Sequence, residues 1–131
     1  MQLQEAVIFG IAAMALHEMG HVAAARALKV KVHQVGINWK GPYIRRACGT
    51  TTQNLAITLA GPGMNLWLAF MFYRVSPNFA LSNLLIGVIN LLPIPASDGS
   101  RVLQLMRKLI SLSDGTVATT ATPITGGAEV K

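Results

Sequence analysis

Long apolar runs separated by short polar stretches dominate this chain. Three of the runs have the character of membrane-spanning helices, and they cover residues 6–25, 55–73 and 79–92. The first run has ionisable side chains only at His17, Glu18 and His21, and the second has no charged residue. A helix needs about 20 apolar residues to cross a bilayer. The pattern therefore predicts transmembrane helices at about residues 6–27, 54–74 and 79–93.

The third run ends in a proline-containing stretch, Asn-Leu-Leu-Pro-Ile-Pro-Ala-Ser-Asp-Gly, at residues 90–99. Proline removes a backbone donor and disfavours helical geometry in the residue before it. The third helix is therefore expected to unwind within the membrane and to continue as a loop. Such a break is tolerated only where protein or a water-filled cavity covers the freed backbone.

Two shorter patterns complete the predicted fold. β-branched residues on either side of Lys40-Gly41-Pro42 predict a β-hairpin at about residues 31–46. An amphipathic helix is predicted at about residues 100–112, because apolar positions recur there on one helical face: Val102, Leu105, Met106, Leu109 and Ile110. The Thr-, Gly- and Ala-rich residues 113–131 are predicted to form a disordered tail.

The expected fold class is therefore an all-α membrane protein. It has a three-transmembrane-helix core, a small β-hairpin after the first helix and a C-terminal amphipathic helix, within one domain over residues 1–112. Composition agrees, since 52% of the 131 residues are apolar and only 12% are charged, against about 25% charged in a typical soluble domain. The mean hydropathy is +0.47.

The net charge of +6 is distributed unevenly. With three spans, every Lys and Arg except Arg74 falls on the side of the hairpin and the amphipathic helix. The positive-inside rule then predicts a cytoplasmic hairpin and an outside N-terminus. Trp39 and Tyr43 are the only aromatic residues among the basic ones, which argues against nucleic acid as a partner. The lipid bilayer is the expected partner instead.

The first run carries the sequence His17-Glu18-Met19-Gly20-His21. Positions i and i+4 of a helix share one face, so both imidazoles can bind one zinc ion. Glu18 lies beside them, where it can deprotonate a water molecule at the metal and pass the proton to the leaving amine. Ionisable groups at membrane depth are costly and usually functional. The alternative is a pair of histidines hydrogen-bonded in the core, with Glu18 paired to a distant cation.

A catalytic zinc ion needs a third protein ligand and an open position. The remaining candidates are Glu5, His33, Asp98, Asp114 and Glu129. Two of these lie in the predicted tail, Glu5 lies about three helical turns from His17, and His33 lies in the hairpin beyond the membrane edge. Asp98 follows the broken third span, which returns to the face near which His17 and His21 lie. The residues therefore favour Asp98.

Three motifs in this order make the chain resemble the site-2 protease family of intramembrane zinc metalloproteases. They are His17-Glu18-x-x-His21, Gly61-x-x-x-Asn65 within an Ala-Gly-Pro context, and Asn90-x-x-Pro93 leading to Asp98-Gly99. The resemblance covers residues 6 to about 110. The sequence departs from the family pattern at Ser97, where the family commonly has leucine.

This resemblance implies one Zn²⁺ per chain, with His17, His21 and Asp98 as its ligands and Glu18 as the general base. It also implies that Asn65 and Asn90 line the active site, where an amide can donate to an oxyanion or hold the substrate backbone. The alternative for both asparagines is a hydrogen bond between helices. In that case Gly61 and Gly63 serve close helix packing.

The implied function is zinc-dependent intramembrane endopeptidase activity. The substrate would be a membrane-anchored protein cut in or near its transmembrane segment, as in regulated intramembrane proteolysis, and the hairpin edge offers a place for an extended strand to pair. The implied location is a bacterial or archaeal cytoplasmic membrane, with a multi-pass chain and an active site near the cytoplasmic face. Since no PDZ-like or nucleotide-sensing segment is recognisable, either regulation and substrate choice come from elsewhere, for example from a regulatory partner, or the chain is a minimal or truncated member of the family.

Two alternatives compete with this interpretation. One is a catalytically silent membrane protein of the same fold that binds metal or a partner, and the intact Glu18 argues against it. The other is a soluble zinc peptidase with a core made of the apolar runs. The uncharged second run and the uneven distribution of basic residues argue against a soluble protein.

Overall fold

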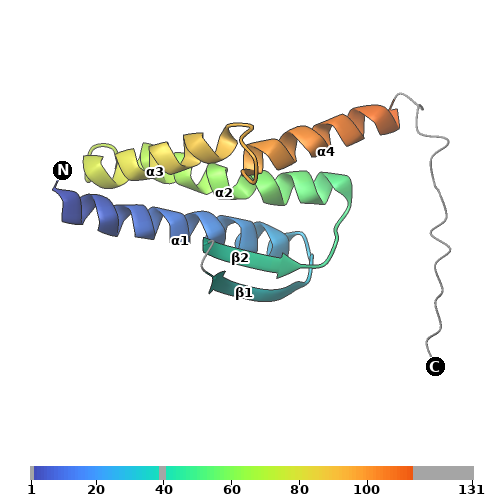
Figure 1. Cartoon of the computed structure of the whole chain (residues 1–131), viewed down its shortest axis with the longest axis horizontal. Coiled ribbons are helices and arrows are strands. Elements are labelled where there is room, and N and C mark those ends of the chain that lie inside the picture. Colours follow the sequence, from blue (N-terminus) through green and yellow to red (C-terminus); the bar gives the residue numbers. More distant parts are fainter. Residues whose placement is uncertain (1, 39–40, 114–131) are drawn as a thin grey trace.

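The structure is a computed structural model that describes residues 2–38 and 41–113. Its elements are α1 (Leu3–Ala27), β1 (Val32–Asn38), β2 (Gly41–Arg46), α2 (Thr51–Phe72), α3 (Pro77–Leu91) and α4 (Asp98–Ser113). Helices α1, α2 and α3 lie side by side, α4 packs against α2 beyond the end of α3, and the hairpin flanks the C-terminal half of α1 (Figure 1). Nearly all of the predicted tail lies outside the described residues.

Helices α1 and α2 are long and apolar enough to cross a membrane. A capping box starts α2, in which Thr50 and Gln53 each accept a hydrogen bond from the backbone N–H of the other. The outer faces of the two helices expose large apolar side chains, among them Ile11 and Phe70, which are 68% and 70% exposed. Apolar surface of this extent is rare on soluble monomers, and it indicates a membrane protein.

The prediction of three transmembrane helices is wrong, because α3 has only 15 residues. At 1.5 Å per residue it extends roughly 22 Å, which is less than the roughly 30 Å of a hydrocarbon core. The helix ends where Leu92 takes an extended conformation ahead of Pro93, as the proline ring requires. Two helices, α1 and α2, meet the length requirement among the described residues. The predicted orientation, with a cytoplasmic hairpin and an outside N-terminus, assumed three membrane spans, and it stays a prediction.

The hairpin predicted at about residues 31–46 is confirmed. Strands β1 and β2 pair antiparallel, with Val35 opposite Ile44 and an irregularity between Val32 and Gln34. The amphipathic helix is also present as α4, although it begins at Asp98 rather than near residue 100. Three residues of its predicted apolar face are partly buried (Val102, Leu105 and Leu109). The other two, Met106 and Ile110, are exposed.

The interior between the helices is unusually polar. Seven polar or charged residues are buried there: His17, His21, Thr58, Asn65, Ser82, Asn83 and Asp98. Small residues allow this close packing, since a Cβ atom on Gly20 would lie 2.6 Å from the Ala60 carbonyl oxygen of α2. Polar side chains buried between closely packed helices must satisfy one another. The polar interior is therefore where a functional site is expected.

Candidate metal centre and active site

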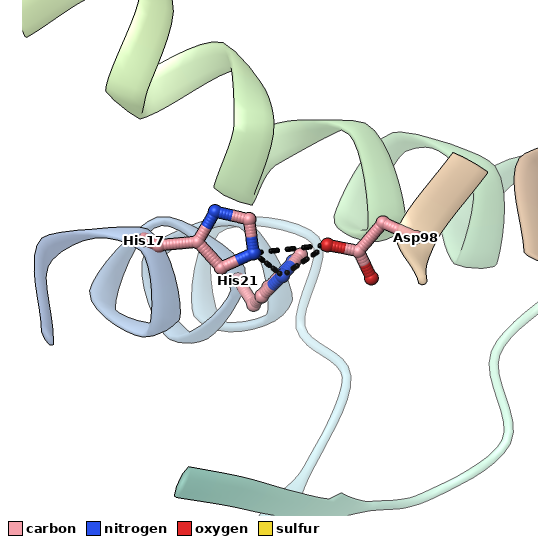
Figure 2. Close-up of side chains that lie close together, drawn as sticks. All are labelled: His17, His21 and Asp98. Carbon is pink, nitrogen blue, oxygen red and sulfur yellow. Dashed lines mark hydrogen bonds and ion pairs between the residues drawn. The ribbon is translucent and has the colours of Figure 1, made fainter. Parts of the chain in front are cut away.

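The structure brings together His17, His21 and Asp98, the three predicted metal ligands. Both histidines project from α1 one turn apart, and the carboxylate of Asp98 reaches them from the start of α4 (Figure 2). Asp98 Oδ2 lies 3.0 Å from Nε2 of each histidine, and the two Nε2 atoms are 3.2 Å apart. All three side chains are buried, with exposed fractions of 2%, 9% and 7%.

Hydrogen bonds to the Nδ1 atom of each imidazole ring determine whether its Nε2 atom is free to bind a metal ion. The Asn65 amide nitrogen donates to the Ala13 carbonyl at 3.0 Å, so its Oδ1 is the acceptor that faces His17 Nδ1 at 2.8 Å. His21 Nδ1 lies 2.7 Å from the backbone carbonyl of Ile57, which can only accept. Both Nδ1 atoms therefore carry the proton, and a neutral ring then presents an Nε2 lone pair to the centre.

This donor set suits a metal ion. Two lone pairs and a carboxylate oxygen that converge within 3.2 Å repel one another unless a proton or a metal ion lies between them. Zinc–ligand distances of about 2.0–2.2 Å imply ligand separations of roughly 3.3–3.6 Å in a tetrahedral site. The observed separations are close to that range. The three residues therefore fit zinc with a small outward movement of the side chains.

The turn between α3 and α4 holds Asp98 in place. Ser97 precedes the helix as its N-cap, because its hydroxyl accepts from the Ser100 N–H at 3.2 Å. The same hydroxyl lies 2.6 Å from the Leu92 carbonyl, to which it can donate. A Cβ atom on Gly99 would overlap the backbone at the end of α3. Ser97, where the sequence departs from the family pattern, is thus one of the groups that fix the Asp98 position.

The Asp98 carboxyl is ionised near neutral pH. Burial alone would raise the pKa of this group, but when the rings of His17 and His21 also carry a proton on Nε2, their contacts with the carboxylate outweigh burial and hold that pKa well below its usual range. Arg101 Nη1 lies 3.9 Å from Asp98 Oδ1 at the edge of the site. An ionised carboxylate is the form that binds a metal ion.

Glu18 shares a cavity with the three ligands. The cavity has a volume of about 230 Å³ and is lined by His17, Glu18, His21, Ile44, Arg46, Ile57, Thr58, Asn90, Ala96, Asp98 and Arg101. Glu18 is partly exposed to this space, whereas the ligands are buried. A carboxylate beside a metal-binding cluster and open to a cavity is suited to exchange protons with a reactant bound there.

The two predicted substrate-binding asparagines differ in position. Asn65 is fully buried, and its amide nitrogen donates to both the Ala13 carbonyl and Asn83 Oδ1. Neither N–H is left for an oxyanion, so the geometry favours the alternative of a hydrogen bond between helices, here one that orients His17. Asn90 lines the cavity, and its amide donates to Ile86 of the same helix. A contact between Asn90 and substrate stays a prediction.

Of the other candidate ligands, Asp114 and Glu129 lie outside the described residues. The structure places Glu5 and His33 and also reveals a residue that the sequence prediction missed. Glu5 lies at the start of α1, near Gln2 and Asn78, and His33 lines a separate surface hollow beside Arg26. Asn83, which is fully buried, completes the hydrogen-bonded chain to Asn65 and His17. Its signal was a polar side chain inside the apolar run 79–92.

Replacing Asn65 with leucine, which is similar in size, is expected to weaken zinc binding about 10- to 100-fold. His17 loses the acceptor that keeps its Nε2 lone pair directed at the metal. Competition against a zinc chelator measures the affinity, and circular dichroism checks that the helices remain. Asn90→Leu is the matched control, because the Asn90 amide bonds within its own helix. An unchanged zinc affinity in a folded Asn65→Leu protein would contradict the positioning role.

Comparison with known proteins finds a structural neighbour. The chain matches no family model and no curated protein. Among solved structures it is similar to a site-2 protease from Methanocaldococcus jannaschii, with a TM-score of 0.66 and 25% sequence identity. The match covers 80% of this chain and 53% of the neighbour, so the chain corresponds to about half of that protein. The likeness indicates an intramembrane-protease fold and supports a protease in general.

Proposed function

We propose that this protein is a zinc-dependent intramembrane endopeptidase. The observation that carries the proposal is the meeting of His17, His21 and Asp98, with Glu18 in the same cavity. The similarity to a site-2 protease supports this function independently of the site geometry. The presence of Glu18 favours an enzyme over a protein that only binds metal, because metal binding alone needs no proton acceptor.

The site residues divide the work of peptide hydrolysis. His17, His21 and Asp98 would hold the metal, which when bound supplies Lewis-acid activation of water and of the scissile carbonyl. Glu18 accepts the proton that the attacking water loses and then donates it to the amide nitrogen of the leaving group. Asn65 holds His17 in the required tautomer and orientation throughout.

The membrane setting defines the substrate class. Two of the three ligands, His17 and His21, lie on α1, a helix of 25 residues with a largely exposed apolar surface, so a reactant would come from within or beside the bilayer. A transmembrane helix hides its carbonyls in internal hydrogen bonds and must unwind before hydrolysis. Ile44 and Arg46 of β2 line the cavity, which supports binding of the unwound segment along the hairpin. We propose the cytoplasmic face of a prokaryotic membrane as the location.

Zinc removal provides the test of this function. The purified protein in detergent micelles is expected to cleave at least one of a panel of single-span membrane proteins, at a bond in or near the span. Incubation with a zinc chelator should abolish cleavage, and added Zn²⁺ should restore it, because the three ligands do not by themselves activate water. Mass spectrometry of the products maps the bond. Cleavage that persists in a protein shown to be free of metal would overturn the zinc mechanism.

A further inference from the structure

Three basic side chains line a groove that leads away from the catalytic cavity. The groove lies between α2, α4 and the end of β2, and its lining residues are Arg46, Asn54, Thr58, Arg101, Gln104, Leu105 and Lys108. We call it the basic groove. Arg46, Thr58 and Arg101 line both the groove and the catalytic cavity. A chain bound across the metal ligands can therefore continue into the basic groove without a break.

The charge in the basic groove is balanced only in part, through the ion pair of Arg101 with Asp98. No carboxylate lines it among the described residues, and Arg101 approaches Asp98 only at 3.9 Å from an exposed position. Arg46 donates a hydrogen bond to Asn54, a neutral group. Burial and the nearby charge of Arg101 both lower the pKa of the Arg46 guanidinium. The guanidinium groups of Arg46 and Arg101 repel each other, and an anionic ligand bound between them would relieve this repulsion.

We infer that the basic groove is a substrate subsite that binds acidic side chains near the scissile bond; this inference rests on the proposed function. A peptide is favoured over a lipid headgroup because the groove opens into the catalytic cavity. The polar side chains of Asn54, Thr58 and Gln104 also offer hydrogen bonds to a peptide backbone. Guanidinium groups bind carboxylates through paired hydrogen bonds, which suits aspartate and glutamate.

The length of the basic groove limits where the acidic residues must lie. Lys108 is ten residues beyond Asp98 on α4, which is roughly 15 Å along the helix. An extended peptide covers about 3.3 Å per residue. Acidic residues are therefore expected within about five residues of the scissile bond. They are expected on one side of that bond only, because the basic groove leaves the cavity in one direction.

The test uses one single-span substrate in three versions, with Asp/Glu, Asn/Gln or Lys at the five positions on one side of its cleavage site. A second set of three versions carries the same changes on the other side of that site. Binding to the Glu18→Gln protein is measured in phosphatidylcholine nanodiscs, so that the readout does not depend on cleavage. The acidic version is expected to bind about five- to tenfold more tightly than the neutral one, as for two or three partly exposed ion pairs. The preference should weaken with added salt.

Variants of α4 provide the matched comparison. Lys108→Glu and Arg101→Gln are each expected to reduce the preference for the acidic substrate, and Lys108→Glu to favour the Lys version. Arg107→Glu makes the same charge change on an exposed neighbour that does not line the basic groove, and it should keep the wild-type preference. Equal loss in Arg107→Glu and Lys108→Glu would assign the effect to overall charge and overturn the inference.

Two further outcomes separate the possible failures. If wild type cleaves the neutral substrate but the nanodisc binding shows no preference for acidic residues, the inference is wrong and the proposed function stands. If binding is independent of substrate charge but changes with added phosphatidylglycerol, and Lys108→Glu removes that change, the basic groove binds lipid and the inference is likewise overturned. A preference for acidic peptides without any cleavage by wild type would overturn the proposed function, and the basic groove would then be a binding site for acidic peptides and not a substrate subsite.

Discussion

Replacing Glu18 with glutamine is expected to abolish peptide cleavage while zinc stays bound. Glutamine keeps the size of the side chain in the cavity but has no carboxylate to accept the proton from the attacking water. Loss of a general base lowers rates by about 10² to 10⁴-fold, which would place cleavage at the limit of detection for a slow intramembrane protease. The three ligands are untouched, so zinc content should match that of wild type.

The experiment measures cleavage and zinc content on the same preparations. Products are quantified by gel or mass spectrometry with a substrate that wild type cleaves, and zinc by atomic emission. Glu5→Gln is the matched control, since Glu5 lies exposed at the start of α1, where it bonds to Gln2 and Asn78. It should cleave like wild type. Wild-type cleavage by Glu18→Gln would contradict the mechanism, and loss of zinc would show a structural role for Glu18.

Replacing Gly61 with alanine is expected to destroy the metal centre. A Cβ atom at this position of α2 would overlap Nε2 of His21 and lie 2.9 Å from Nε2 of His17. These are the two atoms that would bind zinc, so the methyl group of alanine would push both imidazole rings away from their metal-binding positions. Loss of a hydrogen bond that orients a ligand lowers metal affinity by up to roughly 100-fold. The Gly61→Ala substitution displaces the ligand rings themselves, so zinc affinity should fall by more than this.

Gly63→Ala provides the control for this substitution. Gly63 is on the same helix, two residues away, and a Cβ atom there meets nothing within 4 Å. Both substitutions raise helix propensity by a similar amount, so a difference between them reports the clash with the histidines. Zinc titration and cleavage are measured for both, with circular dichroism to confirm folding. Similar zinc affinities in the two variants would show that Gly61 does not limit the site.

The sequence predicted the elements that depend on local pattern. The first helix, the hairpin and α4 were found because apolar periodicity and turn residues act over a few neighbouring positions. The third span failed for a reason that is also local. The prolines after the apolar run 79–92 did predict that this helix unwinds, but the count of three spans did not allow for a helix that already ends at Leu91, where the extended backbone of Leu92 precedes Pro93.

Some residues of the candidate site could be predicted from local sequence alone, and others could not. Histidines four residues apart on one helix face meet without help from the rest of the chain, and Glu18 adjoins them. The motif therefore indicated a metal site before any tertiary structure was known. Asp98 needed the order of the segments along the chain in addition, and the structure brings its Oδ2 to 3.0 Å from both rings.

What the sequence determined by itself is the placement of His17, Glu18 and His21 together, because a motif on one helix depends on spacing alone. Tertiary structure decided what each supporting residue does. It placed Asn83 behind Asn65, and Asn65 behind His17, across three helices. It also set Gly61 against the ligand nitrogens and aligned Arg46 with Arg101 along one groove. These contacts join residues far apart in the chain, and only the packing of the helices determines which of them meet.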